Sequence, residues 1–203
     1  MILRRLVGFG IPFPHMARLR SFRAPTGAAD PRVVKLNASN VGKSERHNER
    51  KNTNYENVNV VPESIPFNVS FKSPGGMTHN EYFDHLVADG RISTRGLKDG
   101  ATFFNEMIID VNTSYFEEHG GYEFAKQLYE EAYRFCREIY GEDQIVSAVM
   151  HADEINAAVS DELGKPVYHY HLHVVAIPTV EKEILWSKRC KDESLRGTVE
   201  YHK

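Results

Sequence analysis

The sequence predicts an α+β domain in which an antiparallel β-sheet is backed by helices on one face. One observation is the order of segments along residues 102–177, which runs strand, helix, strand, hairpin-like connection and strand. The other is the apolar spacing, which changes between every second residue in the strands and about 3.6 residues in the helix. With 203 residues, 41% of them hydrophobic and 26% charged, the chain is long enough for one domain, or one domain plus a tail.

The first half of the chain holds one clear helix. Residues 24–41 are rich in Gly, Pro, Ser and Asn and predict a loop or arm. Residues 48–66 are polar and predict at most one weak strand or extended segment. After the turn at 74–76, Thr78 can cap a helix that stops at Gly90. The apolar stripe of this helix comprises Tyr82, Phe83, Leu86 and Val87.

The second half alternates strands with one long helix. Residues 102–111 form an apolar, β-rich run, and residues 121–140 repeat apolar side chains at helical spacing. Residues 145–150 and 167–177 predict two further strands, and residues 181–191 predict a turn into a helix.

Charge is unevenly distributed along the chain. Residues 1–51 hold eleven Lys and Arg against three acids, a net charge of +8, and because the whole chain carries −3 the rest carries −11. A basic arm on an acidic body suits a protein that binds a polyanion at a carboxylate-bearing site, although a solvated basic tail is the plainer interpretation. We expect residues 1–36 to be this arm, either partly disordered or preceding a natural start at Met16.

The sequence supports neither a membrane-spanning protein nor a disulfide-rich secreted protein. No run approaches the roughly 18 apolar residues needed to span a bilayer. Cys136 and Cys190 lack the dense, even spacing of a disulfide framework, which favours a reducing, cytoplasmic location.

The strongest chemical signal is a row of histidines. The run from Tyr168 to Pro178 alternates with period two and carries His169, His171 and His173. In a strand these three share one face, about 6.6 Å apart. Two neighbouring imidazoles can converge on one cation, whereas three do so only if the strand bends, so one of them is expected to face solvent or DNA.

His151 closes the preceding strand and opens the stretch His-Ala-Asp-Glu. If the two strands are neighbours, His151 completes a three-histidine site that keeps open positions for water or phosphate oxygens. Of Asp153 and Glu154, one can orient a ligand histidine and the other can serve as a base. A surface histidine ladder or a pH-sensitive patch is the alternative. Burying several imidazoles without partners is costly, which favours the metal site.

These motifs resemble those of the plasmid mobilisation and recombination relaxases, the Mob/Pre family of MobV type. The family's metal motif, His-x-Asp-Glu and then Pro-His-x-His and a later proline, is matched by residues 151–154, residues 171–173 and Pro178. Its N-terminal motif, His-Asn-x-Arg before an Asn-rich stretch, resembles residues 47–50 and the asparagines between residues 52 and 68. The resemblance covers residues 37–200 and implies a relaxase-like fold related to His-hydrophobe-His endonucleases.

The chain departs from the family pattern in two places. The spacer after Glu154 is longer, and residues 161–165 predict an inserted β-hairpin turn. Tyr170 stands where the family has the proline, next to the extra His169. Since relatives are expected to continue past Lys203, residues 37–203 are interpreted as a relaxase catalytic domain truncated at its C-terminus.

The resemblance implies a metal-dependent DNA strand transferase that nicks and rejoins one strand at a plasmid origin of transfer through a covalent protein–DNA intermediate. It implies His47 as the nucleophile, Glu154 as the group that accepts a hydrogen bond or proton from it, and Arg50 as the holder of the phosphate or of the His47 loop. The implied metal ligands are His151, His171 and His173. The implied ion is Mn²⁺ or Mg²⁺, although three imidazoles would also hold Zn²⁺, Ni²⁺ or Co²⁺.

Several alternatives stay open. A tyrosine is the competing nucleophile: strand alternation points Tyr168 and Tyr170 away from the metal, while Tyr55 lies in the loop after His47. Other functions are a truncated DNA-binding remnant without catalysis, or a three-histidine metalloenzyme that does not act on nucleic acid. Candidate contacts to a single-stranded or supercoiled plasmid DNA partner are Lys43, Arg46, Lys51, Arg91 and Arg95.

Overall fold

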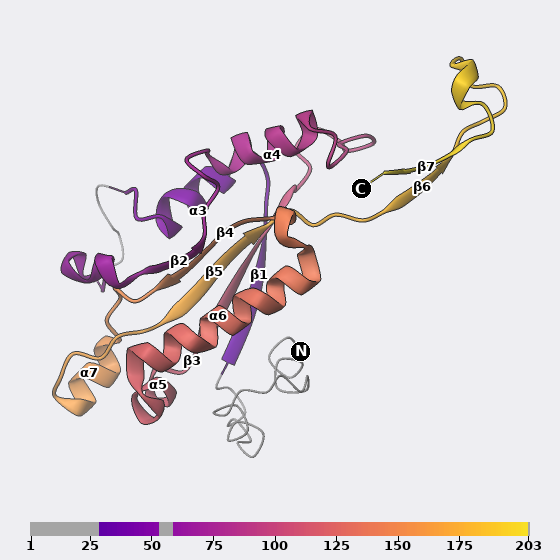
Figure 1. Ribbon diagram of the computed structural model, residues 1–203. Helices are drawn as coiled ribbons and strands as arrows, with labels where there is room; N and C mark the ends of the chain where they lie inside the picture. The colour runs from indigo at the N-terminus through magenta and orange to yellow at the C-terminus, as the bar shows by residue number, and fades with distance from the viewer. Residues whose placement is uncertain (1–28, 53–58, 203) are drawn as a thin grey trace.

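The centre of the molecule is a five-stranded antiparallel sheet with the order β1-β3-β5-β4-β2 (Figure 1). The computed structural model describes residues 29–52 and 59–202, so Tyr55 lies outside the described residues. The strands are β1 (Ala29–Leu36), β2 (Val69–Lys72), β3 (Phe104–Val111), β4 (Ile145–His151) and β5 (His171–Ala176). β5 is the central strand, and because its side chains pack in apolar clusters on both faces of the sheet, all its residues are buried. The predicted α+β fold class is confirmed.

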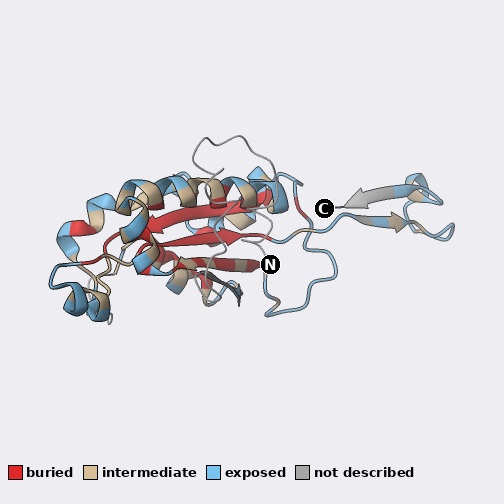
Figure 2. Ribbon diagram, turned by 90° about the horizontal axis from the view of Figure 1, so that it is seen from below, coloured by how far each residue is buried: buried red, intermediate tan, exposed pale blue. Residues whose placement is uncertain are grey.

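One face of this sheet is covered by α5 (Thr113–His119) and α6 (Gly121–Tyr140), as Figures 1 and 2 show. The apolar stripe of α6 packs on the alternate apolar residues of the strands, and Tyr129 and Leu172 are fully buried between them. The helix has the predicted bounds and ends at Gly141, whose φ of +89° favours glycine.

The opposite face also carries helices, α3 (Val41–Asn48) and α4 (His79–Ala88), so helices cover both faces and not one face as predicted. The predicted cap of α4 is present as a reciprocal pair, in which Thr78 accepts from the Glu81 backbone and Glu81 accepts from the Thr78 backbone. A second, smaller apolar cluster holds these helices on the sheet; it includes Leu36, Val41, Leu86, Phe104 and Val175.

Three local predictions are wrong. Ala29–Leu36 is the edge strand β1, paired with β3 along its whole length, and not a loop or arm. Residues 161–165 lie in no hairpin turn, because α7 (Ala157–Leu163) is capped by Asn156 and ends at Gly164. Residues 181–191 contain no helix but β6 (Lys182–Leu185), which pairs with β7 (Val199–His202).

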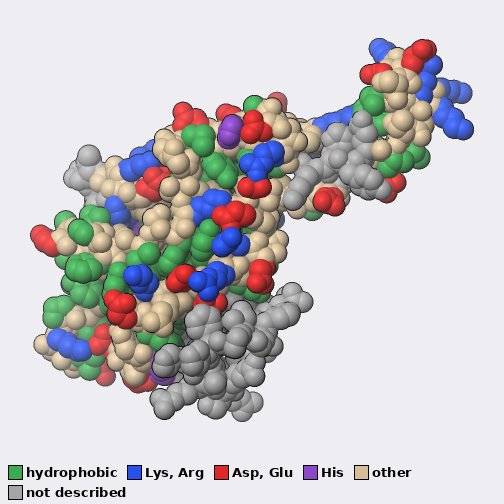
Figure 3. Space-filling view, in the orientation of Figure 1, with side chains coloured by type: hydrophobic (Ala, Val, Ile, Leu, Met, Phe, Trp, Pro, Cys, Tyr) green, Lys and Arg blue, Asp and Glu red, His purple; other side chains and the backbone are tan. Residues whose placement is uncertain are grey.

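The β6–β7 hairpin projects away from the sheet, and Lys and Arg side chains gather at its tip (Figures 1 and 3). Short 3₁₀ turns complete the described chain: η1 (Pro62–Phe67), η2 (Glu142–Gln144) and η3 (Glu193–Leu195). Over the described residues, no helix combines the length and the apolar character that a membrane crossing requires.

Candidate active site and metal centre

Strand pairing brings the motif histidines together. β4 and β5 are antiparallel neighbours, with His151 opposite His171 and Val149 opposite His173. The condition for a shared histidine site, that these two strands are neighbours, is therefore met. Since cross-strand partners share a face, the three imidazoles lie on the face that also carries α3. All three are buried.

The three rings form a nearly equilateral triangle. Ring centroids lie 5.0 Å apart for His151 and His171, 4.8 Å for His151 and His173, and 5.0 Å for His171 and His173. The Nδ1 of His151 faces the Nε2 of His171 at 3.2 Å. We call these three residues the histidine triangle.

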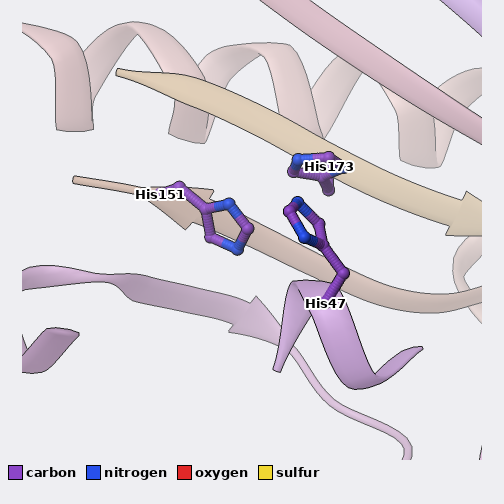
Figure 4. Close-up of side chains that lie close together, drawn as sticks. All are labelled: His47, His151 and His173. Carbon is purple, nitrogen blue, oxygen red and sulfur yellow. The ribbon is translucent and has the colours of Figure 1, made fainter. Parts of the chain in front are cut away.

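His47 reaches the triangle from α3, more than a hundred residues upstream in the chain. Its ring centroid lies 5.4 Å from that of His151 and 5.4 Å from that of His173 (Figure 4). Ligand atoms of His47, His151 and His173 all fall within 4.8 Å of one another. The same holds for His151, Glu154 and His171, so a carboxylate borders the triangle as well.

Burial favours the neutral form of His47, His151 and His171. It lowers the pKa of His151 and of His171 well below the usual range, and the neighbouring His173 lowers both further. Burial also lowers the pKa of His47, with further lowering from His173. Neutral imidazole is the form that binds metals and the form that acts as a nucleophile.

Glu106, which sequence reasoning missed, fixes the tautomer of His173. Its Oε1 lies 2.9 Å from His173 Nδ1 and accepts from Asn48 Nδ2 at 2.8 Å. Although burial opposes it, these bonds hold the pKa of Glu106 at about 2. A carboxylate only accepts, so His173 carries a proton on Nδ1, and Nε2 is the nitrogen that faces away from Glu106. The available signal was a charged residue inside the apolar run of β3.

Asn48 orients His151 in the same way. The Asn48 backbone oxygen lies 2.9 Å from His151 Nε2, and since a carbonyl only accepts, the proton sits on Nε2. The bare Nδ1 then points to His171.

Two overlapping donor sets are close enough to hold a divalent cation, His47 with His151 and His173, and His151 with Glu154 and His171, whereas the three predicted ligands are split between them. Among the described residues, His173 Nε2 is buried without a hydrogen-bond partner, and His171 turns its Nε2 toward His151 Nδ1 at 3.2 Å and Glu154 Oε1 at 4.0 Å. Buried polar atoms rarely stay unpartnered, and a bare imidazole nitrogen is satisfied by a metal. Three imidazoles with a nearby carboxylate suit Mn²⁺, Zn²⁺ and related ions.

Arg50 ties the His47 segment to the end of β4. Its guanidinium donates two hydrogen bonds of 2.7 Å to Asp153, one of 2.7 Å to Glu154 and one of 3.3 Å to the His47 carbonyl. Only 3% of the side chain is exposed. Of its two expected roles, holding a phosphate or holding the His47 loop, these contacts favour the second. Its φ of +52°, uncommon outside glycine, is consistent with a segment fixed by these bonds.

His169 and the two tyrosines beside it lie outside the triangle. His169 stacks on His171 at 5.1 Å, and its nitrogens face Thr113 and Asp110. Tyr170 packs in the core under α5 and α6. The Tyr168 hydroxyl lies 3.0 Å from Ser64 Oγ.

The candidate DNA contacts divide into two groups. Lys43 and Arg46 are exposed on α3, the helix that carries His47. Lys51 comes just after this helix and pairs with Glu45 and Glu49. Arg91 pairs with Asp143, and Arg95 stacks on the Trp186 ring at 4.6 Å, both beyond α4. The structure therefore brings only the first three basic residues to the helix that bears His47.

Comparison with known proteins finds similarity to plasmid recombination enzymes. The family model described by that name matches residues 30–202. A plasmid recombination enzyme of Lactiplantibacillus plantarum is 27% identical over 160 residues, covering 78% of this chain and 40% of the relative. A type 2 plasmid recombination enzyme of Staphylococcus aureus is 25% identical over 61% of this chain and 29% of its own length. The chain thus spans less than a third of that relative.

Solved structures agree on the fold. The MobM relaxase domain bound to plasmid oriT DNA, in a manganese-bound crystal structure, has a TM-score of 0.61 and 20% identity, and covers 83% of this chain and 76% of that one. A second manganese-bound structure of that domain with oriT DNA gives a TM-score of 0.61 at 23% identity. At such identity the likeness shows the fold alone. The family match, which extends over most of the chain, shows more: the chain belongs to the Mob/Pre family of plasmid recombination enzymes.

Proposed function

We propose that the chain is the catalytic part of a metal-dependent DNA relaxase, which nicks and rejoins one strand at a plasmid origin of transfer. The observation that carries this proposal is the position of His47, whose ring lies 5.4 Å from two members of a buried three-imidazole cluster. A nucleophile beside a metal site is the arrangement that phosphoryl transfer needs.

The histidine triangle would hold a divalent ion, Mn²⁺ or Mg²⁺ by preference. When bound, such an ion polarises the non-bridging phosphate oxygens and neutralises charge in the transition state. The manganese in the MobM structures supports Mn²⁺ as the first ion to test.

His47 supplies the nucleophile. Its neutral imidazole attacks phosphorus, the new bond is phosphorus to nitrogen, and the bond to the 3′ oxygen breaks, so that this oxygen leaves and takes a proton. The imidazole proton passes to Glu154 or to solvent. Because the phosphoramidate keeps the energy of the phosphodiester, attack by a 3′ hydroxyl reverses the reaction and rejoins the strand.

Other residues position the nucleophile. Arg50 fixes the backbone at His47 through the His47 carbonyl and the two carboxylates at the end of β4. Exposed Lys43 and Arg46 lie where they can pair with the DNA backbone near His47.

The test is relaxation of supercoiled plasmid DNA that carries the gene's own upstream region. With Mn²⁺ we expect nicked circles and a covalent protein–DNA species, and with EDTA neither. A gel shift without nicking would favour the alternative of a DNA-binding remnant. Failure to bind any single-stranded DNA at low salt would favour a metalloenzyme with another substrate.

A further inference from the structure

His47, which the proposed function uses as the nucleophile, also belongs to a set of nitrogen donors that could share one cation. The ligand atoms of His47, His151 and His173 lie within 4.8 Å of one another, and Figure 4 shows the three rings beside one another. We call these three residues the nucleophile set. His151, Glu154 and His171 are equally close and do not include His47; we call them the carboxylate set. Because His151 belongs to both sets, the two are not independent.

His151 can serve only one of the two sets at a time. Its Nε2 lies 2.9 Å from the Asn48 carbonyl oxygen and carries the proton, so only Nδ1 has a free lone pair. One imidazole lone pair binds one ion. The two sets are therefore alternative sites for a single ion, and only the carboxylate set leaves His47 free.

The nucleophile set is oriented by Asn48, the residue that follows His47. The Asn48 backbone oxygen fixes His151, and its Nδ2 donates at 2.8 Å to Glu106, whose Oε1 lies 2.9 Å from His173 Nδ1. Hydrogen bonds of this kind orient ligand imidazoles and strengthen metal binding. The end of α3 is thus tied to both partners of His47. Within the described parts of the chain, His173 Nε2 has no hydrogen-bond partner.

The two sets differ in the chemistry of their donors. The nucleophile set consists of three imidazoles, which Zn²⁺ and Ni²⁺ prefer, whereas the carboxylate set includes an oxygen donor, which suits Mg²⁺ and Mn²⁺. In the carboxylate set, Glu154 Oε1 already accepts a hydrogen bond of 2.7 Å from Arg50. An ion that prefers imidazole is therefore expected to select the set that contains His47.

We propose that His47 is itself a metal ligand, which holds Zn²⁺ or a similar imidazole-preferring ion together with His151 and His173. A neutral imidazole has one bare nitrogen, so His47 has no lone pair left to attack phosphorus while it is bound in this way. Zn²⁺ in the nucleophile set therefore inhibits strand transfer. The inhibition rests on the proposed relaxase function, whereas the ligand assignment does not.

The first experiment measures Zn²⁺ affinity without DNA, by competition with a chromophoric chelator. His47→Ala removes a donor of the nucleophile set only and should lower the affinity by about 100-fold or more, since even residues that merely orient a ligand contribute about 10–100-fold. His171→Ala removes a donor of the carboxylate set only and should cost much less. His85→Ala, on the exposed side of α4, is the matched control and should bind Zn²⁺ as the wild type does. A loss in His171→Ala that equals or exceeds the loss in His47→Ala would overturn the proposal, as would a wild type that does not bind Zn²⁺.

A second measurement uses the unaltered protein and does not depend on the folding of any variant. Diethyl pyrocarbonate modifies neutral imidazoles, and mass spectrometry identifies the modified residues. A saturating concentration of Zn²⁺ should protect His47, which is only half-buried, and should leave the exposed His85 reactive. Mg²⁺ should protect His47 far less. Equal modification of His47 with and without Zn²⁺ would contradict its role as a ligand.

Nicking of supercoiled plasmid separates this proposal from the function on which its inhibitory part rests. In the presence of Mn²⁺, added Zn²⁺ should stop nicking, and a chelator selective for Zn²⁺ should restore it. Nicking that Zn²⁺ does not affect, or Zn²⁺ binding that does not depend on His47, removes the inhibitory site and leaves the relaxase. Zn²⁺ binding that depends on His47, without nicking or a covalent species in Mn²⁺ or Mg²⁺, removes the strand-transfer function and leaves a metal site that includes His47.

Discussion

The two faces of the central sheet are built by the same strands, but only one of them carries the buried histidines. In β5, Leu172 and Val174 point to α5 and α6 and join the larger apolar core, while His171 and His173 point to the α3 side. In β3, Met107 points to the larger apolar core, while its neighbour Glu106 points to the α3 side and contacts His173. The face under α5 and α6 therefore holds the larger apolar core, whereas the α3 side combines the smaller apolar cluster with the buried histidines.

The difference has an energetic consequence. Buried imidazoles, a buried carboxylate and unpartnered nitrogens cost stability on one face, and close packing of large apolar side chains on the other offsets that cost. Substitutions on the two faces should then separate function from stability.

The largest expected effect is on strand transfer in His47→Ala. Removing the nucleophile should lower the nicking rate by about 10⁴-fold or more, because no other group takes its place. Since His47 is only half-buried, the free energy of unfolding should change by less than about 1 kcal/mol. Plasmid relaxation and urea denaturation measure the two quantities, and His85→Ala, on the exposed side of α4, is the matched control.

Leu172→Ala should show the reverse pattern. Leu172 is fully buried under α6, so its truncation leaves a cavity and should lower the free energy of unfolding by about 2–5 kcal/mol. Affinity for Mn²⁺ should stay within about twofold, because the histidines lie on the other face. Leu97→Ala, at a half-exposed site, should cost far less. A large loss of Mn²⁺ affinity in folded Leu172→Ala would contradict the separation of the faces.

Glu106→Gln should weaken metal binding without removing a ligand. Gln still accepts from His173 Nδ1 but carries no charge, so affinity for Mn²⁺ should fall by about 10–100-fold. Electron paramagnetic resonance measures the concentration of free Mn²⁺ and so gives this affinity without an activity assay. Glu118→Gln, exposed on α5, should leave the affinity unchanged.

The smallest effect is expected at the cap of α4. Thr78→Ala removes half of the reciprocal cap and should lower the free energy of unfolding by about 1 kcal/mol. Thr78→Ser, which keeps the hydroxyl, should restore most of it. Equal stability of the alanine and serine variants in thermal unfolding would show that the cap contributes nothing.

Local patterns predicted the parts of the fold that depend on local chemistry. The period-two run around His171 and the 3.6-residue spacing of Gly121–Tyr140 each depend on residues of a single segment. The sequence therefore predicts both elements. β1 was missed because Ala29–Leu36 becomes a strand only by pairing with β3, some seventy residues away, and its composition suggests a loop.

The candidate site, too, could be predicted only in part from the sequence. The histidines of β4 and β5 could be placed together once the two strands were assumed to be neighbours. The contact between Glu106 and His173 joins residues 67 positions apart and requires the strand order, which the sequence pattern does not contain. The approach of His47 depends on how α3 packs, and only the resemblance to relaxases indicated it.

The most direct test of the central claim is the position and chemistry of the bond between protein and DNA. The covalent species formed with Mn²⁺ is digested with protease and nuclease, and the modified peptide is identified by mass spectrometry before and after mild acid. We expect a nucleotide on the peptide that contains His47, lost in acid because a phosphoramidate is acid-labile. An acid-stable nucleotide on a tyrosine, such as Tyr55, would contradict the assignment of His47 as the nucleophile.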